Sequence, residues 1–237
     1  WLLDAQNSGA SIISTEAMPP SKLGSNPSVP ISNGWVAVMA RRLTFALPKG
    51  RIIKDAAPIL AEAGLSLEGV AKAGDRRLDY EIGADYRVLL VKPTDVPTYV
   101  GYGVADFGIV GRDTLEEQSR DLYEPVDLEI GRCRMCVAEP RDARTRATAG
   151  TLLKIATKYP TVAERHYRGK GIETEIIPLF GSVELGCLTT LADQIVDIVE
   201  SGETLRQNDL VEVETIFPVS SRLVVSPASL KLDRQRI

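Results

Sequence analysis

Apolar runs alternate along this chain with amphipathic stretches whose apolar residues have helical spacing. The run at 43–47 is followed by a basic loop and then by apolar positions spaced as on one face of a helix, up to Gly64. Similar runs, each predicted to be a strand, lie at 87–91, 105–110, 152–156, 173–179, 210–216 and 222–225. Strands that alternate with helices predict an α/β fold built on mostly parallel sheet.

The segment 193–206 carries the strongest functional signal. Its predicted strand has one interior acid, Asp197, and ends at Ser201-Gly202, where residues suited to the first turn of a helix begin. Backbone N–H groups after such a turn can converge on one anion, and the helix dipole and the hydroxyls of Ser201 and Thr204 add to the attraction. A carboxylate just ahead of the turn can accept hydrogen bonds from sugar hydroxyls. The segment therefore predicts a site for a ribose 5-phosphate.

Two further basic loops stand where strands are predicted to end. Lys49 and Arg51 follow the first strand, and a point charge and a bidentate fork both suit phosphate or pyrophosphate. Lys158 has a similar place in the segment 157–159, ahead of a predicted helix. The alternative is that these are solvated surface charges. The single histidine, His166, lies on the polar part of that helix, so we expect no catalytic or metal-binding role for it.

Composition narrows the class of protein. A length of 237 residues suffices for one large or two small domains, and a net charge of −4 gives no basic field for nucleic acid. No apolar run approaches the ~20 residues of a membrane helix, so we expect no membrane association. Three cysteines do not make a disulfide framework, and we expect a cytoplasmic, thiol-reduced protein. Cys133 and Cys136 have C-x-x-C spacing, but positions three apart on a strand face opposite sides, which favours neither a redox motif nor a zinc site.

Residues 1–38 differ from the rest of the chain. They are rich in Ser, Pro, Gly and Asn and have few charges, and such a composition cannot bury enough apolar surface to fold alone. Met39, just ahead of the first strand, has the position of a natural start. We expect residues 1–38 to be a tail or a non-native extension that is dispensable for stability and substrate binding. The alternative is a genuine disordered arm.

Several motifs occur in one order along the chain. The segment 193–205 has the pattern D-x-I-V-D-x-V-x-S-G-x-T-L and follows G-S-V-E at 181–184. Upstream lie V-K-P-T-D-V-P-T-Y-V at 91–100, I-A-T-K-Y-P at 155–160 and an arginine-bearing loop at 75–78. Together, from about 43 to 225, they resemble ATP phosphoribosyltransferase, the glycosyltransferase that begins histidine biosynthesis.

This resemblance implies a fold and a reaction. It implies two α/β domains of type II periplasmic-binding-protein-like architecture, with the active site in the cleft between them. We expect residues 39–132 with 211–237 to form the first domain and 133–210 to form the second. The implied reaction transfers the 5-phosphoribosyl group from 5-phosphoribosyl 1-pyrophosphate (PRPP) to N1 of ATP, with Mg²⁺ as cofactor and pyrophosphate as the second product.

The resemblance also implies site residues. Candidate catalytic residues are Asp197, Lys49 and Arg51. Candidate PRPP-binding residues are Asp193, Asp197, Glu200, Ser201, Gly202, Glu203, Thr204 and Leu205. Candidate ATP- or pyrophosphate-binding residues are Lys49, Gly50, Arg51, Arg76, Asp95, Thr157, Lys158, Tyr159, Gly181, Ser182 and Glu184. The metal ligands stay open. Adenine N1 is already a nucleophile, so the chemistry needs no histidine base and can rest on positioning and on stabilising the leaving pyrophosphate.

The chain departs from the family pattern at a few positions, which affect the expected ATP contacts more than the PRPP loop. Ser201 stands where Thr is usual, Gly186-Cys187 where Ala-Pro is usual, and Thr190 where glycine is common. One alternative is a non-catalytic small-molecule binding protein of the same fold, which a secretion signal would mark. A salvage-type phosphoribosyltransferase would need two adjacent acids before the loop, and Ile198 stands in the second place.

The segment 231–237 is too short to form the additional histidine-binding domain found in the long form of the family. The chain therefore resembles the short form, whose catalytic subunits assemble with a separate regulatory subunit similar to histidyl-tRNA synthetase. We expect a homo-oligomer, dimeric or larger, that needs this partner for full activity. Histidine alone should not inhibit it, because feedback requires two linked sites.

Overall fold

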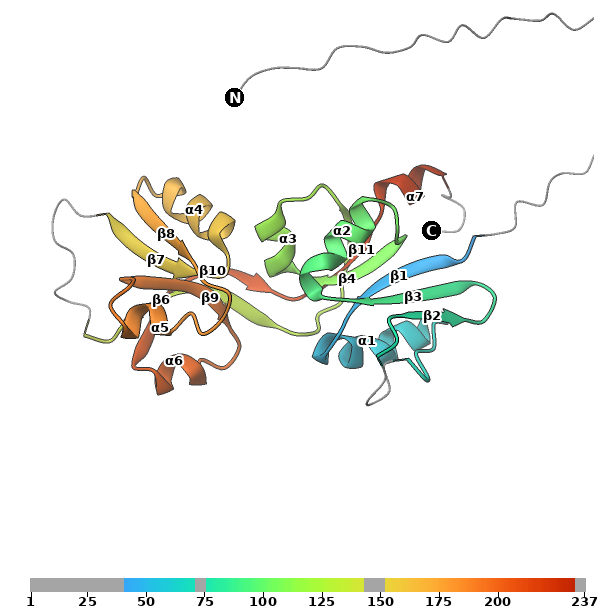
Figure 1. Ribbon diagram of the computed structural model, residues 1–237, viewed down its shortest axis with the longest axis horizontal. Coiled ribbons are helices and arrows are strands. Elements are labelled where there is room, and N and C mark those ends of the chain that lie inside the picture. Colours follow the sequence, from blue (N-terminus) through green and yellow to red (C-terminus); the bar gives the residue numbers. More distant parts are fainter. Residues whose placement is uncertain (1–40, 71–75, 143–151, 233–237) are drawn as a thin grey trace, which may run out of the picture. The chain divides into compact units, whose positions relative to one another are not determined.

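The computed structural model describes residues 41–70, 76–142 and 152–232 (Figure 1). The expectations for residues 1–38 lie outside these ranges. The described residues belong to one compact unit, which contains two mixed β-sheets.

Sheet A has six strands in the order β2-β3-β1-β4-β11-β5. The strands are β1 (Leu43–Pro48), β2 (Asp79–Ile82), β3 (Tyr86–Val91), β4 (Phe107–Gly111), β5 (Tyr123–Asp127) and β11 (Ser221–Val225). β1 runs parallel to β3 and β4, while the remaining pairs are antiparallel. Because parallel strands end at one edge, the loops after β1, β3 and β4 gather there.

Helices cover both faces of sheet A, as side chains that alternate along β1 require. Leu47 packs with α1 (Arg51–Glu62), while Ala46 packs on the opposite face with α2 (Val96–Gly101) and α3 (Arg112–Gln118) (Figure 1). The short 3₁₀ turn η1 (Pro93–Asp95) precedes α2, and α7 (Pro227–Leu232) follows β11. This double covering explains why the predicted strands are apolar runs without polar alternation.

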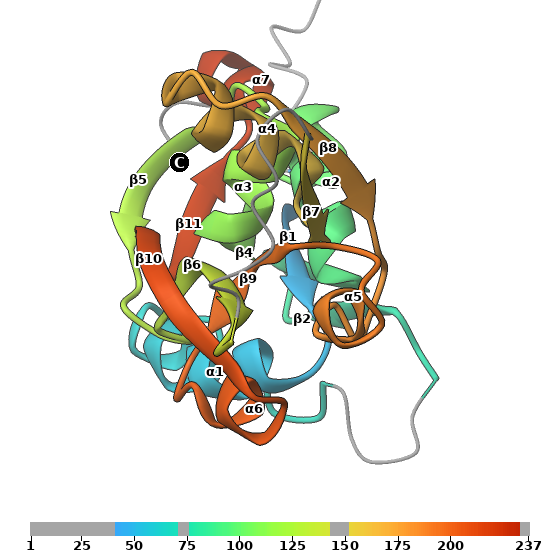
Figure 2. The same ribbon diagram turned by 90° about the vertical axis from the view of Figure 1, so that its left-hand side faces the viewer.

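Sheet B has five strands in the order β10-β6-β9-β7-β8. They are β6 (Cys133–Pro140), β7 (Leu153–Thr157), β8 (Thr174–Pro178), β9 (Gln194–Val199) and β10 (Leu210–Val219). The helix α4 (Pro160–Gly169) packs on one face, and α5 (Leu185–Leu188) and α6 (Glu203–Gln207) lie on the other (Figure 2). β7 is parallel to β8 and β9, and β6 is antiparallel to β9 and β10.

Two segments carry the chain between the sheets. One joins β5 to β6, and the other is Ser220, between β10 and β11. The two crossings are hydrogen-bonded to each other: Leu128 N–H donates to Ser221 O at 3.0 Å, and Ser221 N–H donates to Ile130 O at 2.9 Å. The sheets are therefore linked at one place by a paired backbone rather than by a single strand.

The predicted strands are confirmed at their positions, and so is the helix that ends before Gly64. The expectation of mostly parallel sheet is wrong, because each sheet keeps a parallel centre and has antiparallel strands beside it. The expected grouping of 211–237 with the first domain also differs from the structure, since β10 pairs with β6 in sheet B and the return to sheet A comes at Ser220. The domain boundaries themselves stay a prediction. The pattern of residues did not predict β2 or α3.

Candidate functional site

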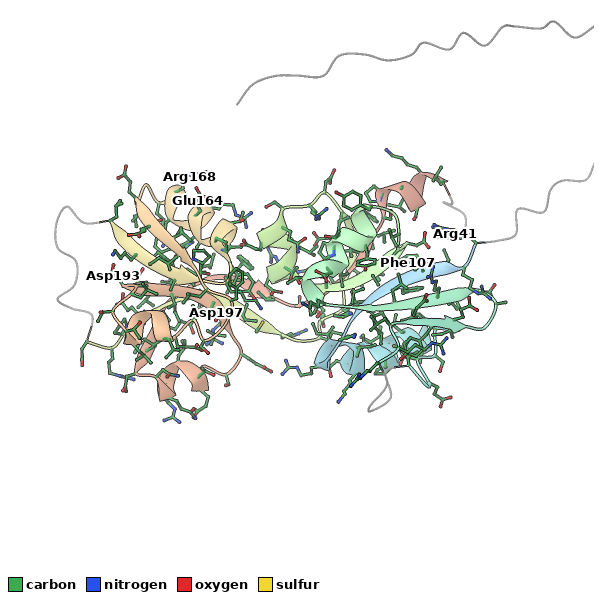
Figure 3. The ribbon with its side chains drawn as sticks, in the orientation of Figure 1. Arg41, Phe107, Glu164, Arg168, Asp193 and Asp197 are labelled. Carbon is green, nitrogen blue, oxygen red and sulfur yellow. The ribbon has the colours of Figure 1, made fainter. Side chains whose placement is uncertain are left out.

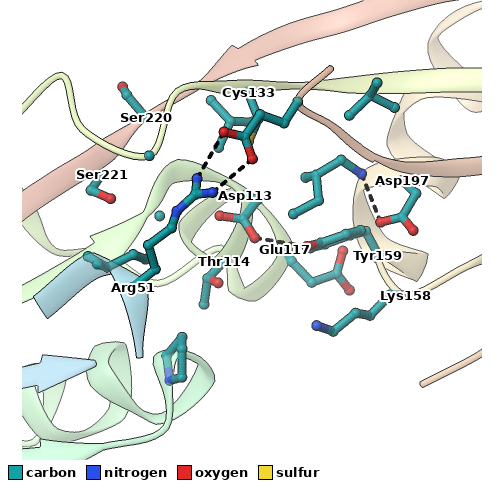
Figure 4. A pocket seen from close by; sticks show the side chains of 18 of the residues that line it. Arg51, Asp113, Thr114, Glu117, Cys133, Lys158, Tyr159, Asp197, Ser220 and Ser221 are labelled. Carbon is teal, nitrogen blue, oxygen red and sulfur yellow. Dashed lines mark hydrogen bonds and ion pairs between the residues drawn. The ribbon is translucent and has the colours of Figure 1, made fainter. Parts of the chain in front are cut away.

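A pocket of about 810 Å³ is lined by loops and helix ends that follow strands of both sheets (Figure 4). Sheet A contributes Lys49 and Arg51 after β1, Lys92 after β3, and Asp113 with Glu117 on α3. Sheet B contributes the loop after β7, the last residues of β9 and the segment after it. A site at the carboxyl ends of parallel strands is the usual place for a ligand in an α/β protein.

Residues 201–205, which we call the anion loop, form one wall of this pocket. Gly202 has φ +79°, in the left-handed region that favours glycine. Among the described residues, no acceptor takes the backbone N–H groups of Ser201, Gly202 or Thr204, so they remain able to donate to a ligand. The predicted helix begins at Glu203 but has only 5 residues, so its dipole adds little and the loop's own N–H and hydroxyl groups matter more.

Asp197 lies on β9, inside the pocket and just ahead of the anion loop. Its Oδ1 accepts a hydrogen bond from the backbone N–H of Ile198 at 2.8 Å. Burial first, together with the nearby carboxylates of Glu184 and Asp113, raises the pKa of Asp197 to about 6, against the hydrogen bond from Ile198 and the charge of Lys158. The carboxylate is therefore costly to ionise without a ligand and has a free Oδ2 that can accept from a hydroxyl.

An ion pair joins the two sheets across the pocket. Arg51, at the start of α1, donates to both carboxylate oxygens of Glu200, with Nη1–Oε2 at 3.0 Å and Nη2–Oε1 at 3.2 Å (Figure 4). Both side chains are 60% exposed, so solvent screens the pair and its strength is modest. The fork that holds this carboxylate has the geometry that holds a phosphate.

The helix α3 makes a second contact between the sheets. Asp113 accepts a hydrogen bond from the Tyr159 hydroxyl at 2.9 Å, and burial first, then Asp113, raises the pKa of that hydroxyl. An added Cβ at Gly111 would overlap Asp113 Oδ1, so glycine is needed there for the inward carboxylate. Glu117 accepts from the backbone N–H groups of the first turn of α4, both at 3.0 Å. The protein's own carboxylate therefore occupies the start of α4, where the sequence predicted room for an anion.

Lysines supply the other positive charge in the pocket. Lys49, Lys92 and Lys158 all line it, and Lys158 Nζ lies 6.0 Å from the centre of the Tyr159 ring. Cys133 also lines the pocket, and burial raises the pKa of its thiol to about 11, which keeps it protonated. The predicted opposite facing of Cys133 and Cys136 is confirmed, because they pack into hydrophobic clusters on the two faces of sheet B.

Many of the predicted site residues meet in this pocket. They are Lys49, Arg51, Lys158, Tyr159, Glu184, Asp197, Glu200, Ser201, Gly202, Thr204 and Leu205. They come from four separate segments of the chain. Their roles stay predictions, but the structure places them within reach of one ligand-sized space.

Other predicted residues do not line the pocket. These are Gly50, Arg76, Asp95, Thr157, Gly181, Ser182, Asp193 and Glu203. Asp193 lies just before β9, where it accepts from the Lys154 N–H at 2.9 Å, and Figure 3 shows it well apart from Asp197. Thr157 is buried and donates to Val196 O at 2.6 Å, and Glu203 pairs with Arg206 on its own helix.

The pattern of residues missed several pocket residues. They are Lys92, Thr94, Asp113, Thr114, Glu117, Gln118, Cys133, Ser220 and Ser221, among others. The motif 91–100 pointed to the first two, and the G-R-D triplet at 111–113 marked a glycine beside an acid without predicting the helix that presents it. Nothing local to Ser220 signals that the chain crosses between sheets there.

The described residues contain no group of three or more His, Cys, Asp or Glu side chains placed to hold a metal ion. None of the helices they form is both long enough and apolar enough to cross a membrane. Cys133, Cys136 and Cys187 are not joined in a disulfide.

Comparisons with known proteins agree with the motif order. The family described as "HisG: ATP phosphoribosyltransferase" matches residues 92–237. The chain is 49% identical over 203 residues to an ATP phosphoribosyltransferase of Syntrophotalea carbinolica, an alignment that covers 84% of this chain and 92% of the relative. It is 48% identical over 202 residues to "ATP phosphoribosyltransferase 2" of Geobacter sulfurreducens, covering 84% and 95%.

Solved structures give the same result. The chain matches "ATP phosphoribosyl transferase (HisG:HisZ) complex from Thermotoga maritima" with a TM-score of 0.70 and 36% identity, over 82% of this chain and 92% of that chain. The periplasmic aliphatic sulphonate binding protein SsuA from Escherichia coli matches with a TM-score of 0.51 and 11% identity, over 82% and 68%. That second likeness shows a shared fold with periplasmic binding proteins and nothing about function.

Proposed function

We propose, on the premise that this chain belongs to the ATP phosphoribosyltransferase family, that the pocket between the ends of β1 and β9 is where it joins PRPP to ATP. The enzyme is a glycosyltransferase of histidine biosynthesis that moves the 5-phosphoribosyl group to N1 of ATP and releases pyrophosphate. A solute-binding role would rest on the shared fold alone. One observation carries the site: an anion loop, a half-buried acid and a basic loop from the other sheet line the same pocket.

The anion loop binds the 5-phosphate of PRPP. Its support is the set of backbone N–H groups at Ser201, Gly202 and Thr204 that have no acceptor among the described residues, together with two hydroxyls. Asp197 then lies one short step back along β9, where Oδ2 can accept from the ribose hydroxyls. Because neighbouring residues bind the 5-phosphate and the ribose hydroxyls, both ends of one sugar are held.

The opposite wall receives the pyrophosphate. Lys49 and Arg51 lie there on sheet A, and Arg51 exchanges its carboxylate partner Glu200 for a phosphate oxygen of the same geometry. The adenine N1 lone pair forms a bond to C1 of the ribose as the bond from C1 to pyrophosphate breaks. The pyrophosphate leaves with the electron pair of the broken bond, and Lys49 and Arg51 stabilise its charge.

The positive charge that develops on the sugar lies close to Asp197. Its raised pKa shows that the pocket itself does not satisfy the ionised carboxylate, so a cationic transition state gains more from it than the neutral ground state does. Catalysis therefore comes from positioning and electrostatics, without a histidine.

A divalent metal belongs to this family's reaction, and we infer that it is Mg²⁺. No three-ligand cluster of the described residues can hold it, which suits an ion bound mainly through substrate phosphates with one or two carboxylates. Asp197 and Glu200 are carboxylates that line the pocket, and they would hold the ion together with the phosphates. When bound, the ion would neutralise charge on the leaving group.

The partner and the compartment are also proposals. A solved relative is a complex of HisG with HisZ, which supports assembly of this chain, as a homo-oligomer, with a regulatory subunit similar to histidyl-tRNA synthetase. Biosynthetic relatives, and three cysteines that are not joined in a disulfide, support a cytoplasmic location.

Gly202→Val tests the site. A valine strongly disfavours the φ of +79° and adds bulk beside the anion loop, so PRPP affinity should fall at least ten-fold while ATP affinity changes little. The measurements are calorimetry with each substrate and release of pyrophosphate from PRPP, ATP and Mg²⁺, after circular dichroism has shown that the variant is folded. Unchanged PRPP affinity in a folded Gly202→Val protein would refute the site.

A further inference from the structure

Arg134 lies behind the anion loop and holds two elements at once. It is on β6, where its Nε and Nη2 contact the carboxylate of Glu212 on β10 at 2.6–3.0 Å. Its Nη1 donates to the backbone carbonyl of Glu200 at 3.0 Å. The residues that line the pocket do not include Arg134.

Glu212 is itself held in place. Its Oε1 accepts from the Thr215 hydroxyl at 2.8 Å and from the Cys136 thiol at 3.1 Å. The register of β10 shifts between Glu212 and Glu214, and such a bulge re-aims side chains beside a site. Arg134 first, with these hydrogen bonds, holds the pKa of Glu212 at about 2, so the carboxylate is ionised. Arg134 therefore has a fixed anchor.

The carbonyl that Arg134 binds belongs to the peptide that opens the anion loop. A trans peptide is planar, so its C=O and N–H point in opposite directions. Holding the Glu200 carbonyl toward Arg134 therefore holds the N–H of Ser201 away from Arg134. Ser201 lines the pocket, and its N–H has no acceptor among the described residues.

We propose that Arg134, anchored by Glu212, is a positioning residue that fixes the Glu200–Ser201 peptide so that the Ser201 N–H faces the 5-phosphate of PRPP. This rests on the proposed function of the anion loop. Glu200 is then held twice, through its carbonyl by Arg134 and through its carboxylate by Arg51 from the other sheet. When pyrophosphate binds Arg51, only the contact between Arg134 and the Glu200 carbonyl persists.

Arg134→Met removes every side-chain donor while keeping an unbranched apolar side chain. We expect the KM for PRPP to rise about three- to ten-fold, the effect of one hydrogen bond, while the KM for ATP changes less than about two-fold. Affinity for ribose 5-phosphate, which carries no pyrophosphate, should fall by the same factor in calorimetry. Arg132→Met is the matched control, because Arg132 is exposed and has its ion pair and hydrogen bond with nearby Glu129, and it should leave both KM values unchanged.

A second variant separates positioning from stability. Arg134→Met alone leaves the Glu212 carboxylate without its partner, which lowers the melting temperature. Adding Glu212→Gln removes that charge, so the double variant should regain much of the lost stability. Its KM for PRPP should stay raised, because the Glu200 carbonyl is still not held.

The outcomes distinguish a failure of the role of Arg134 from a failure of the proposed anion loop. If the double variant regains PRPP affinity along with its melting temperature, Arg134 is merely structural and the inference is wrong. It is also wrong if Arg134→Met leaves ribose 5-phosphate affinity unchanged while Gly202→Val abolishes it. If neither variant affects ribose 5-phosphate, the proposed anion loop itself fails.

Discussion

Asp197→Asn should make the protein more stable at neutral pH and less able to bind PRPP. The structure raises the pKa of this carboxyl from 3.8 to about 6, chiefly by burial. A rise of that size corresponds to roughly 3 kcal/mol between the two protonation states. Asparagine resembles the protonated acid and can still accept the hydrogen bond from the Ile198 N–H, so it avoids the cost of ionising the wild-type residue.

The direction of this pKa shift determines the pH range over which it changes the stability of the protein. A carboxyl whose pKa is higher in the folded state than in the unfolded state loses stability as pH rises from about 4 to about 6. The advantage of Asp197→Asn should therefore be largest above pH 7 and vanish near pH 4. For a domain of this size, roughly 3 kcal/mol corresponds to a rise in melting temperature of about 6–12 °C.

Thermal denaturation across pH 4–8 measures this difference. Asp85→Asn is the matched control, because Asp85 is exposed in the turn between β2 and β3 and lies outside the pocket. The control should follow the wild type at every pH. A melting difference for Asp197→Asn that does not vary with pH, or that is negative at pH 7.5, would show that burial of this charge is not the cause.

Asp197→Asn should weaken substrate binding, although it raises stability. Loss of the charged acceptor for the ribose hydroxyls should weaken PRPP binding by about 1–3 kcal/mol, measured by calorimetry at pH 7.5. In the wild type, kcat/KM for PRPP should also fall below pH 6. A phosphate ester titrates in the same range and also lowers kcat/KM there. The decrease that the wild type shows and Asp197→Asn does not is therefore the part caused by protonation of the carboxyl. A variant that is both more stable and weaker in binding would show a site that holds strain for function.

Two further predictions concern the leaving group and regulation. Arg51→Ala should lower kcat about 100-fold by removing a cation at the departing pyrophosphate, and should leave the melting temperature nearly unchanged because its bond to Glu200 is exposed; a normal kcat would rule this role out. Histidine titrated into the purified chain should neither bind tightly nor inhibit, and inhibition without a partner subunit would contradict the proposed division of labour.

Local sequence was enough for most of the strands and for the centre of the site. The strand of β9, the glycine turn and the start of α6 are consecutive, so their order alone brings Asp197 and the anion loop together. The basic loop at Lys49 and Arg51 was also visible, because it directly follows an apolar run. These features depend on neighbours within a few residues, which a pattern can report.

The partners of those residues depend on the tertiary structure. Arg51 and Glu200 are 149 positions apart, and Arg134 and Glu212 are 78 apart, so no periodicity connects them. The place of β10 is decided by its pairing with β6, which a list of strands does not contain. Glu117 closes the start of α4, although that helix start resembles an anion site by itself. Sequence therefore determined which groups are present, while the packing of two sheets decided which are free to meet a ligand and which already hold one another.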